Sequence, residues 1–384
     1  MRRQIMLLIA LLLLAALAFA PSKSETLQAS EDGVTRVDGV IDGAPYFLYR
    51  PADWNGDLVL LVHGSLPDVF EFLAQDLASH GFGVAYANLP PSAGEAAALK
   101  LVTTNTRIVE AKFTSEFGQP QHTYLYGLSR GAHNMTHLLE TSPSRYDGMF
   151  SACGGNGGSQ LQWNYFFTAR VLFDYYYPGV LPGTPVSTPD IDRAEYAAEI
   201  APLIAGAILA NPGPAFEMAA VEQYPLRYDG FGELVRGIVH SLAIHTIGVD
   251  DLMAAAHGNP FDNQQTVYAG TSNDGALNAG IARFSANPQA RAYLRTWHEP
   301  DGTIAETPVL LLHTTRDPAV PEELTNGKYR ALIESTGNGE FLVRRTISRF
   351  GHCRFSPAEM RSNFFALVHW VETGVPPAHD AEEQ

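Results

Sequence analysis

A serine between two glycines is the first candidate for chemistry in this sequence. Residues 127–131 read Gly-Leu-Ser-Arg-Gly and stand between an apolar run, predicted to be a strand, and an amphipathic stretch, predicted to be a helix. A sharp strand-to-helix turn strains its central residue, and flanking glycines avoid clashes there. The turn would expose the Ser129 hydroxyl above the sheet edge, beside a helix N-terminus that favours negative charge. We therefore predict that Ser129 is a nucleophile; the alternative is a glycine-rich turn with a solvated serine.

A serine hydroxyl becomes a good nucleophile only when a base removes its proton. Among thirteen histidines, His352 is the best placed, because it lies between the last predicted strand and the last predicted helix. A loop there can reach back over the sheet edge. His63, beside a predicted strand, and His133 and His137, on the helix after Ser129, are expected to be structural. We predict that His352 is the general base and acid, the alternative being a surface histidine.

A carboxylate is needed to fix the tautomer of the histidine and to stabilise its protonated form. Asp317 follows the predicted strand at residues 308–312, so its loop opens at the same sheet edge. The chain order Ser129, Asp317, His352 is one in which such triads occur, with each residue at a strand end. The alternative is an aspartate that only initiates a turn before Pro318.

The anionic oxygen of an acyl-transfer intermediate needs two backbone N–H donors. The N–H of Arg130, directly after the nucleophile, is predicted to be one. The other is expected from the loop after the strand at residues 58–62, where Ser65 is favoured over Leu66. Gly64 would let the backbone approach the substrate closely.

Apolar runs alternate with amphipathic stretches along most of the chain, which predicts an α/β fold with a mostly parallel, doubly wound sheet. The strands are predicted at residues 58–62, 83–87, 123–126, 148–152, 308–312 and 341–348, and the helices at 69–80, 104–117, 130–141, 322–334 and 357–373. Residues 154–306 break this alternation and are predicted to be a helical cap over the carboxyl edge. The core domain would comprise residues 21–153 and 307–384.

The cap begins with an aromatic-rich stretch, residues 163–177. Aromatic clusters are more often core than pocket wall. Because the cap is expected to cover the site, we lean slightly toward a pocket role for Phe166 and Tyr176, with a purely structural role as the alternative.

Residues 1–20 have the pattern of a signal peptide, with Arg2 and Arg3 before an apolar run and a small-x-small end at Ala18–Ala20. The alternative is an uncleaved anchor, although the run is short for a membrane span. No later segment is apolar and uninterrupted enough for stable membrane insertion. We expect a secreted or periplasmic protein. In such a compartment Cys153 and Cys353, the only cysteines, are predicted to form a disulfide, because both follow predicted strands at one sheet edge; two buried thiols are the alternative.

Composition narrows the possible partners. The net charge of −16 would repel phosphate backbones, so no nucleic-acid partner is expected. Two cysteines exclude a Cys-rich zinc site, and His240, His245 and His257 are too scattered to indicate one, so neither a metal nor a cofactor is expected. The oligomeric state is left open.

The motifs at 63–64, 127–131 and 351–352, with the Asp317 loop, resemble the α/β-hydrolase superfamily over nearly all of the expected mature chain. More narrowly, the Gly-His-Cys loop at 351–353 is similar to that of secreted bacterial serine esterases and peptidase-like hydrolases. The resemblance implies that a small or polymeric carboxylic ester is cleaved through an acyl-enzyme. A peptidase or amidase is the alternative, and a non-catalytic binding module a further one. Arg130 stands where many members carry a small or apolar residue; it could bind a substrate carboxylate or pair with an acidic neighbour.

Overall fold

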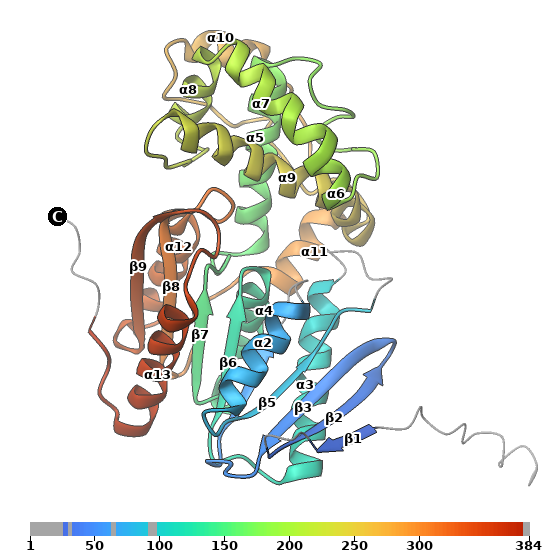
Figure 1. Cartoon of the computed structure of the whole chain (residues 1–384). Coiled ribbons are helices and arrows are strands. Elements are labelled where there is room, and N and C mark those ends of the chain that lie inside the picture. Colours follow the sequence, from blue (N-terminus) through green and yellow to red (C-terminus); the bar gives the residue numbers. More distant parts are fainter. Residues whose placement is uncertain (1–25, 30–32, 63–66, 91–97, 379–384) are drawn as a thin grey trace, which may run out of the picture.

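The computed structural model describes residues 26–29, 33–62, 67–90 and 98–378, so the predicted signal peptide lies outside the described residues. One nine-stranded sheet runs through the core in the order β1-β2-β3-β5-β4-β6-β7-β8-β9 (Figure 1). The strands are β1 (Thr26–Ala29), β2 (Val34–Ile41), β3 (Ala44–Pro51), β4 (Leu58–Val62), β5 (Gly83–Ala87), β6 (Thr123–Leu128), β7 (Gly148–Ala152), β8 (Val309–Arg316) and β9 (Leu342–Phe350).

The six strands from β5 to β9 in this order are parallel, as predicted. Parallel strands have helices on both faces and are therefore apolar along their whole length. β4 is an example, because all five of its residues are buried. β1, β2 and β3 are antiparallel and add to the β5 edge; they are not among the predicted strands. β2 and β3 contain buried, half-buried and, at Val40, exposed residues and are not separated by a helix, so they lack the pattern that marks the other strands.

Helices cover both faces of the sheet, and the side chains of β4 divide between them. Val59 and Leu61 pack with α2 (Pro67–Ala78) and α13 (Pro357–Thr373). Leu58, Leu60 and Val62 point the other way and pack with α3 (Ala98–Phe117), α4 (Arg130–Thr141) and α12 (Glu322–Ser335). The period of two along a strand therefore builds two separate cores from one apolar run.

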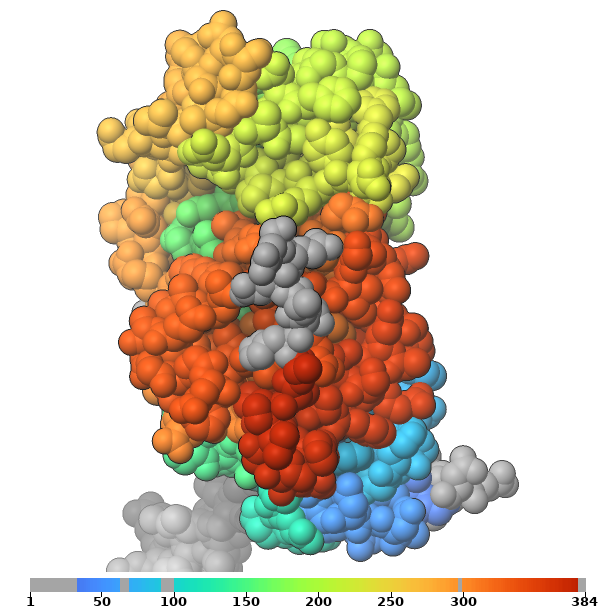
Figure 2. Space-filling model, turned by 90° about the vertical axis from the view of Figure 1, so that its left-hand side faces the viewer, coloured from blue at the N-terminus to red at the C-terminus, as the bar shows by residue number. Residues whose placement is uncertain are grey.

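The chain between β7 and β8 is helical and forms a cap above the carboxyl ends of the strands (Figure 1). Figure 2 shows this cap, coloured green to orange, at one end of the molecule and the blue N-terminal strands at the other. Its elements are α5 (Ser159–Tyr176), α6 (Arg193–Glu195), the π-helical turn η2 (Tyr196–Ile200), α7 (Ala201–Ala210), α8 (Gly213–Ala220), α9 (Phe231–Ala256), α10 (Asp274–Gly280) and α11 (Pro288–His298). Two 3₁₀ turns, η1 (Pro143–Arg145) and η3 (Gly339–Phe341), belong to the core.

The cap has a hydrophobic core of its own, whose buried residues all lie between Tyr165 and Leu294. Phe166 is only 4% exposed and packs inside this cluster, against Trp163 and Tyr165. Phe166 thus belongs to the cap core, whereas Tyr176 is half-buried; a pocket role for these two residues stays a prediction. Within the residues that the structure describes, no helix is long and apolar enough to cross a membrane.

Candidate active site

Ser129 occupies the sharp turn between β6 and α4 that its sequence predicts. Its backbone has φ 53° and ψ −121°, a strained conformation for a residue with a side chain. The turn is so tight that a Cβ at Gly127 would lie 2.8 Å from the backbone nitrogen of Ala132. The Ser129 N–H donates to the carbonyl of Ala152 at the end of β7, 2.9 Å away. Glycine before the serine and a bond to the next strand therefore hold the hydroxyl at the sheet edge.

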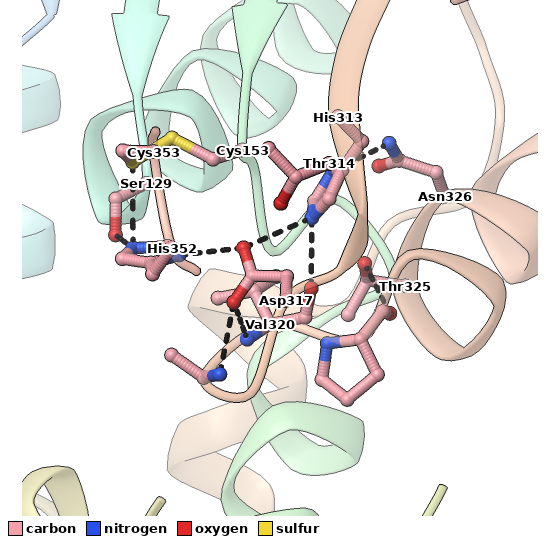
Figure 3. A network of polar contacts seen from close by, with 12 residues as sticks. Ser129, Cys153, His313, Thr314, Asp317, Val320, Thr325, Asn326, His352 and Cys353 are labelled. Carbon is pink, nitrogen blue, oxygen red and sulfur yellow. Dashed lines mark hydrogen bonds and ion pairs between the residues drawn. A yellow bond between two sulfur atoms is a disulfide. The ribbon is translucent and has the colours of Figure 1, made fainter. Parts of the chain in front are cut away.

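The structure brings the three predicted catalytic side chains together (Figure 3). His352 Nε2 lies 2.7 Å from Ser129 Oγ, and its Nδ1 lies 2.7 Å from Asp317 Oδ2. Ser129 follows β6, Asp317 follows β8 and His352 follows β9, so three strands, with β7 between the first two, each deliver one residue at their carboxyl ends. Nδ1–H donating to the carboxylate leaves Nε2 free to accept the serine proton, which is the arrangement that general-base catalysis requires.

Asp317 is held in its charged form. Burial pushes the pKa of this carboxyl group upward, but the charge of His352 and the hydrogen bonds from His313 and His352 outweigh burial and hold the pKa well below its usual range. The other carboxylate oxygen, Oδ1, accepts the N–H groups of Ala319 and Val320 at 2.9 Å each. These contacts favour the ionised form of Asp317 and fix the orientation of its carboxylate beside His352.

His313 supports Asp317 from the opposite side to His352 and was not predicted from the sequence. It is fully buried on β8, four residues before Asp317. Its Nε2 lies 2.8 Å from the Val320 carbonyl oxygen and 3.3 Å from Asp317 Oδ2, while its Nδ1 lies 3.0 Å from Asn326 Nδ2. A donor at Nε2 and an acceptor at Nδ1 satisfy all three contacts, so Asn326 on α12 fixes the tautomer that serves Asp317.

The histidine loop is tied to its neighbours at three points. Gly351 N–H donates to the Arg316 carbonyl, 3.0 Å away, and the Thr314 hydroxyl donates to the Gly351 carbonyl, 2.7 Å away. The predicted disulfide joins Cys353 to Cys153, which directly follows β7; their Cα atoms are 5.2 Å apart. Cys353 Sγ also lies 3.5 Å from His352 Nε2, so the disulfide forms one side of the site.

Removing this disulfide is expected to lower turnover even in protein that remains folded. In the double variant Cys153→Ala and Cys353→Ala, we expect kcat to fall by about tenfold, because a loop that holds His352 loosely loses the hydrogen-bond geometry that catalysis needs. The closed loop has a sequence separation of 200, for which the chain-entropy description gives about 5 kcal/mol of stabilisation. Initial rates and thermal unfolding of the same samples separate the two effects. Two free thiols in the denatured, unreduced wild type would contradict the account.

Of the two predicted oxyanion donors, the structure describes one, the N–H of Arg130. Arg130 is the first residue of α4, so its backbone N–H lies at the helix N-terminus, directly after Ser129. Gly64 and Ser65, together with His63 and Leu66, lie outside the described residues. The Arg130 side chain is half-buried beside Ser129.

His133 has a structural role, in agreement with the sequence analysis. Its Nδ1 lies 2.9 Å from the Gly155 carbonyl oxygen and its Nε2 lies 2.9 Å from the Ser159 hydroxyl. Burial lowers its pKa to about 4 and keeps it neutral. His133 therefore links the nucleophile helix α4 to α5, the first helix of the cap.

Cys153, His352 and Cys353 place three potential ligand atoms within 4.8 Å of one another. Metal sites use cysteine as a thiolate, and here both sulfurs are bonded in the disulfide. The group therefore does not fit a metal; it consists of the disulfide and the catalytic histidine beside it.

Comparisons with known proteins give distant similarities. No protein-family model matches the chain. An o-phthalyl amidase from Xanthobacter agilis is 26% identical over 113 residues, which span 28% of this chain and only 25% of the amidase. Feruloyl esterase B from Aspergillus oryzae superposes over 90% of this chain and 81% of its own, with a TM-score of 0.49 and 14% identity. Pyrococcus horikoshii acylaminoacyl peptidase covers 96% of this chain with 45% of its own, at a TM-score of 0.42 and 12% identity.

The fold itself is identified by features of this chain. A mostly parallel sheet carries an antiparallel extension on one side, and a strained serine turn follows β6. Asp317 follows β8 and His352 follows β9, in the chain order that this architecture uses, and a helical cap is inserted between β7 and β8. The chain has the α/β-hydrolase fold.

Proposed function

We propose that the protein is a serine hydrolase that cleaves carboxylic esters. The observation that carries the proposal is the continuous chain of two 2.7 Å hydrogen bonds from Ser129 through His352 to the buried Asp317. A binding module would not need a strained serine turn, a deprotonated buried carboxylate and a disulfide-tethered histidine loop in one place.

In the acylation step, Ser129 Oγ attacks the carbonyl carbon while His352 Nε2 takes the hydroxyl proton. Negative charge develops on the carbonyl oxygen and is stabilised by the N–H of Arg130 and the N-terminus of α4, with Ser65 proposed as the second donor. His352, stabilised as imidazolium by Asp317, then gives its proton to the leaving oxygen, and the C–O bond breaks.

Deacylation repeats these steps with water in place of serine. His352 takes a proton from water, the resulting hydroxide attacks the acyl carbon, and the bond to Ser129 Oγ breaks as His352 returns the proton to it. The carboxylic acid is released and the serine is restored. The nucleophile, the base and the carboxylate that these steps require are placed within hydrogen-bond distance of one another.

An amidase or peptidase is the second candidate, and the partial similarity to an amidase favours it. The same triad can cleave an amide, but an amine leaves only after it has been protonated, so the requirement on His352 is stricter than for an ester. We place the ester first because the alcohol oxygen is the better leaving group at the same geometry.

A panel of esters with graded acyl length and matched amides tests the proposal. We expect kcat/KM for the best ester to exceed that for its amide by at least about 100-fold. A preference for the amide would establish the second candidate, and hydrolysis of neither class by folded protein would favour a binding function.

We also propose that the mature protein acts outside the cytoplasm. The sequence pattern of residues 1–20 supports export, and a disulfide beside the catalytic histidine is more typical of oxidising compartments. Cell fractionation together with the N-terminal sequence of the mature protein tests this proposal; an intact N-terminus on a cytosolic protein would contradict it.

A further inference from the structure

The cap helix α9 lies across the two loops that carry the acid and the base. Arg316, the residue before Asp317, donates through its Nε to Glu233 Oε2 on α9, 3.0 Å away. One turn further, the guanidinium carbon of Arg236 lies 5.3 Å from the centre of the Phe350 ring, which ends β9. These positions lie on one face of the helix, so α9 is fixed in register on the catalytic edge.

His240 is the next residue on this face, and it meets the catalytic histidine directly. The ring centres of His240 and His352 are 6.0 Å apart, and the rings are nearly perpendicular at 86°. Burial and then the charge of His352 lower the pKa of His240 to about 4, so its imidazole is neutral near pH 7 and offers one donor and one acceptor.

His240 differs from the fully buried or nearly buried histidines elsewhere in the described chain. His133, His245 and His313 each use a ring nitrogen in a hydrogen bond to a protein group. Within residues 26–29, 33–62, 67–90 and 98–378, neither ring nitrogen of His240 has such a bond, and the residue is only half-buried. Its hydrogen-bonding groups are therefore open to a molecule that enters between cap and core.

The proton path indicates which part of a substrate His240 would meet. His352 Nε2 takes its proton from Ser129 and passes it to the leaving atom, so the leaving group must come within about 3 Å of Nε2. A side chain that stands over His352 from the cap is thus next to the leaving group, whereas the acyl carbon and its oxyanion lie toward Ser129 and the N-terminus of α4.

We propose that His240 is a specificity residue that hydrogen-bonds the leaving group, and that the enzyme prefers alcohols with a polar atom near the scissile ester bond. The inference rests on the proposed ester hydrolysis and adds the chemistry of its alcohol side. A packing role would instead make His240 indifferent to the polarity of the alcohol.

Two esters of butanoic acid test this inference, because they differ only on the alcohol side. The 2-methoxyethyl and n-butyl esters have alcohol chains of equal length, and one ether oxygen replaces one methylene group. The ratio to measure is kcat/KM for the methoxyethyl ester divided by kcat/KM for the butyl ester. His240→Phe keeps a ring but removes both nitrogens. We expect this variant to lower the ratio by about fivefold, which corresponds to the loss of one ordinary hydrogen bond. His240→Gln should keep the ratio within about twofold of the wild type.

The ratio is measured on one sample, so it does not depend on the fraction of folded protein. His240→Leu provides a second apolar variant with the same expected ratio if the phenylalanine does not fit. His369→Phe is the matched control, because His369 is exposed on the outer side of α13. An unchanged ratio in both apolar variants would overturn the inference while leaving ester hydrolysis intact. Failure of the wild type to cleave either ester would refute the proposed function itself.

Discussion

Ser129→Ala is expected to lower kcat/KM for the best ester by about 10⁴- to 10⁶-fold, with little change in folding. The substitution removes one hydroxyl group at a half-buried position, so the packing around the turn is preserved. What remains should be the small rate enhancement from substrate binding and the oxyanion donors. Rates and thermal unfolding on the same preparation check this, and residual activity above about one tenth would exclude Ser129 as the nucleophile.

A variant that combines Ser129→Ala with His352→Ala tests whether the two side chains act together. His352→Ala alone should be about as damaging as Ser129→Ala, and the two changes together should be scarcely worse than either one, because the two side chains act as one unit. Additive losses would instead mean that His352 acts independently of the serine.

Asp317→Asn is expected to lower kcat by about 10³- to 10⁴-fold. The asparagine oxygen can still accept the N–H groups of Ala319 and Val320, so the turn should stay intact. Its amide group, however, would donate to His352 Nδ1 and place the proton on Nε2. The base would then have no lone pair facing Ser129 Oγ.

A rate profile against pH separates this tautomer effect from a loss of structure. We expect the low kcat of Asp317→Asn to rise toward alkaline pH, where hydroxide can replace the missing base, while the unfolding temperature stays close to that of the wild type. An asparagine variant with more than about one tenth of the wild-type kcat would show that Asp317 does not orient the base.

Much of the fold follows from the sequence because parallel strands are buried on both faces. β4, β5 and β7 have the predicted bounds, since a continuous apolar run leaves few alternatives. β8 extends to Arg316, beyond the predicted Leu312, because its last residues are polar and their pairing with β9 is not visible in hydropathy. β1–β3 are missed because they form the antiparallel edge of the sheet, and β2 and β3 are only partly buried, so they carry no continuous apolar run.

The triad could be predicted because each member follows a strand, and the carboxyl ends of parallel strands meet at one edge. His313 and His240, which do not follow a strand, could not be predicted in this way. His313 lies inside a strand, and its support of Asp317 depends on a rotamer and on Asn326 from a helix. His240 comes from a cap whose register on the core is set by packing, and no spacing in the sequence relates it to His352.

The most direct test of the account is covalent labelling with a fluorophosphonate, followed by mass spectrometry of the peptides. An activated serine displaces fluoride and retains the phosphonyl group, because the trapped species resembles the tetrahedral intermediate. We predict one adduct per folded chain, on Ser129, lost in Ser129→Ala and much slower to form in His352→Ala. An adduct on another residue, or full ester hydrolysis by protein that resists the reagent, would contradict the central claim that Ser129 carries the acyl group.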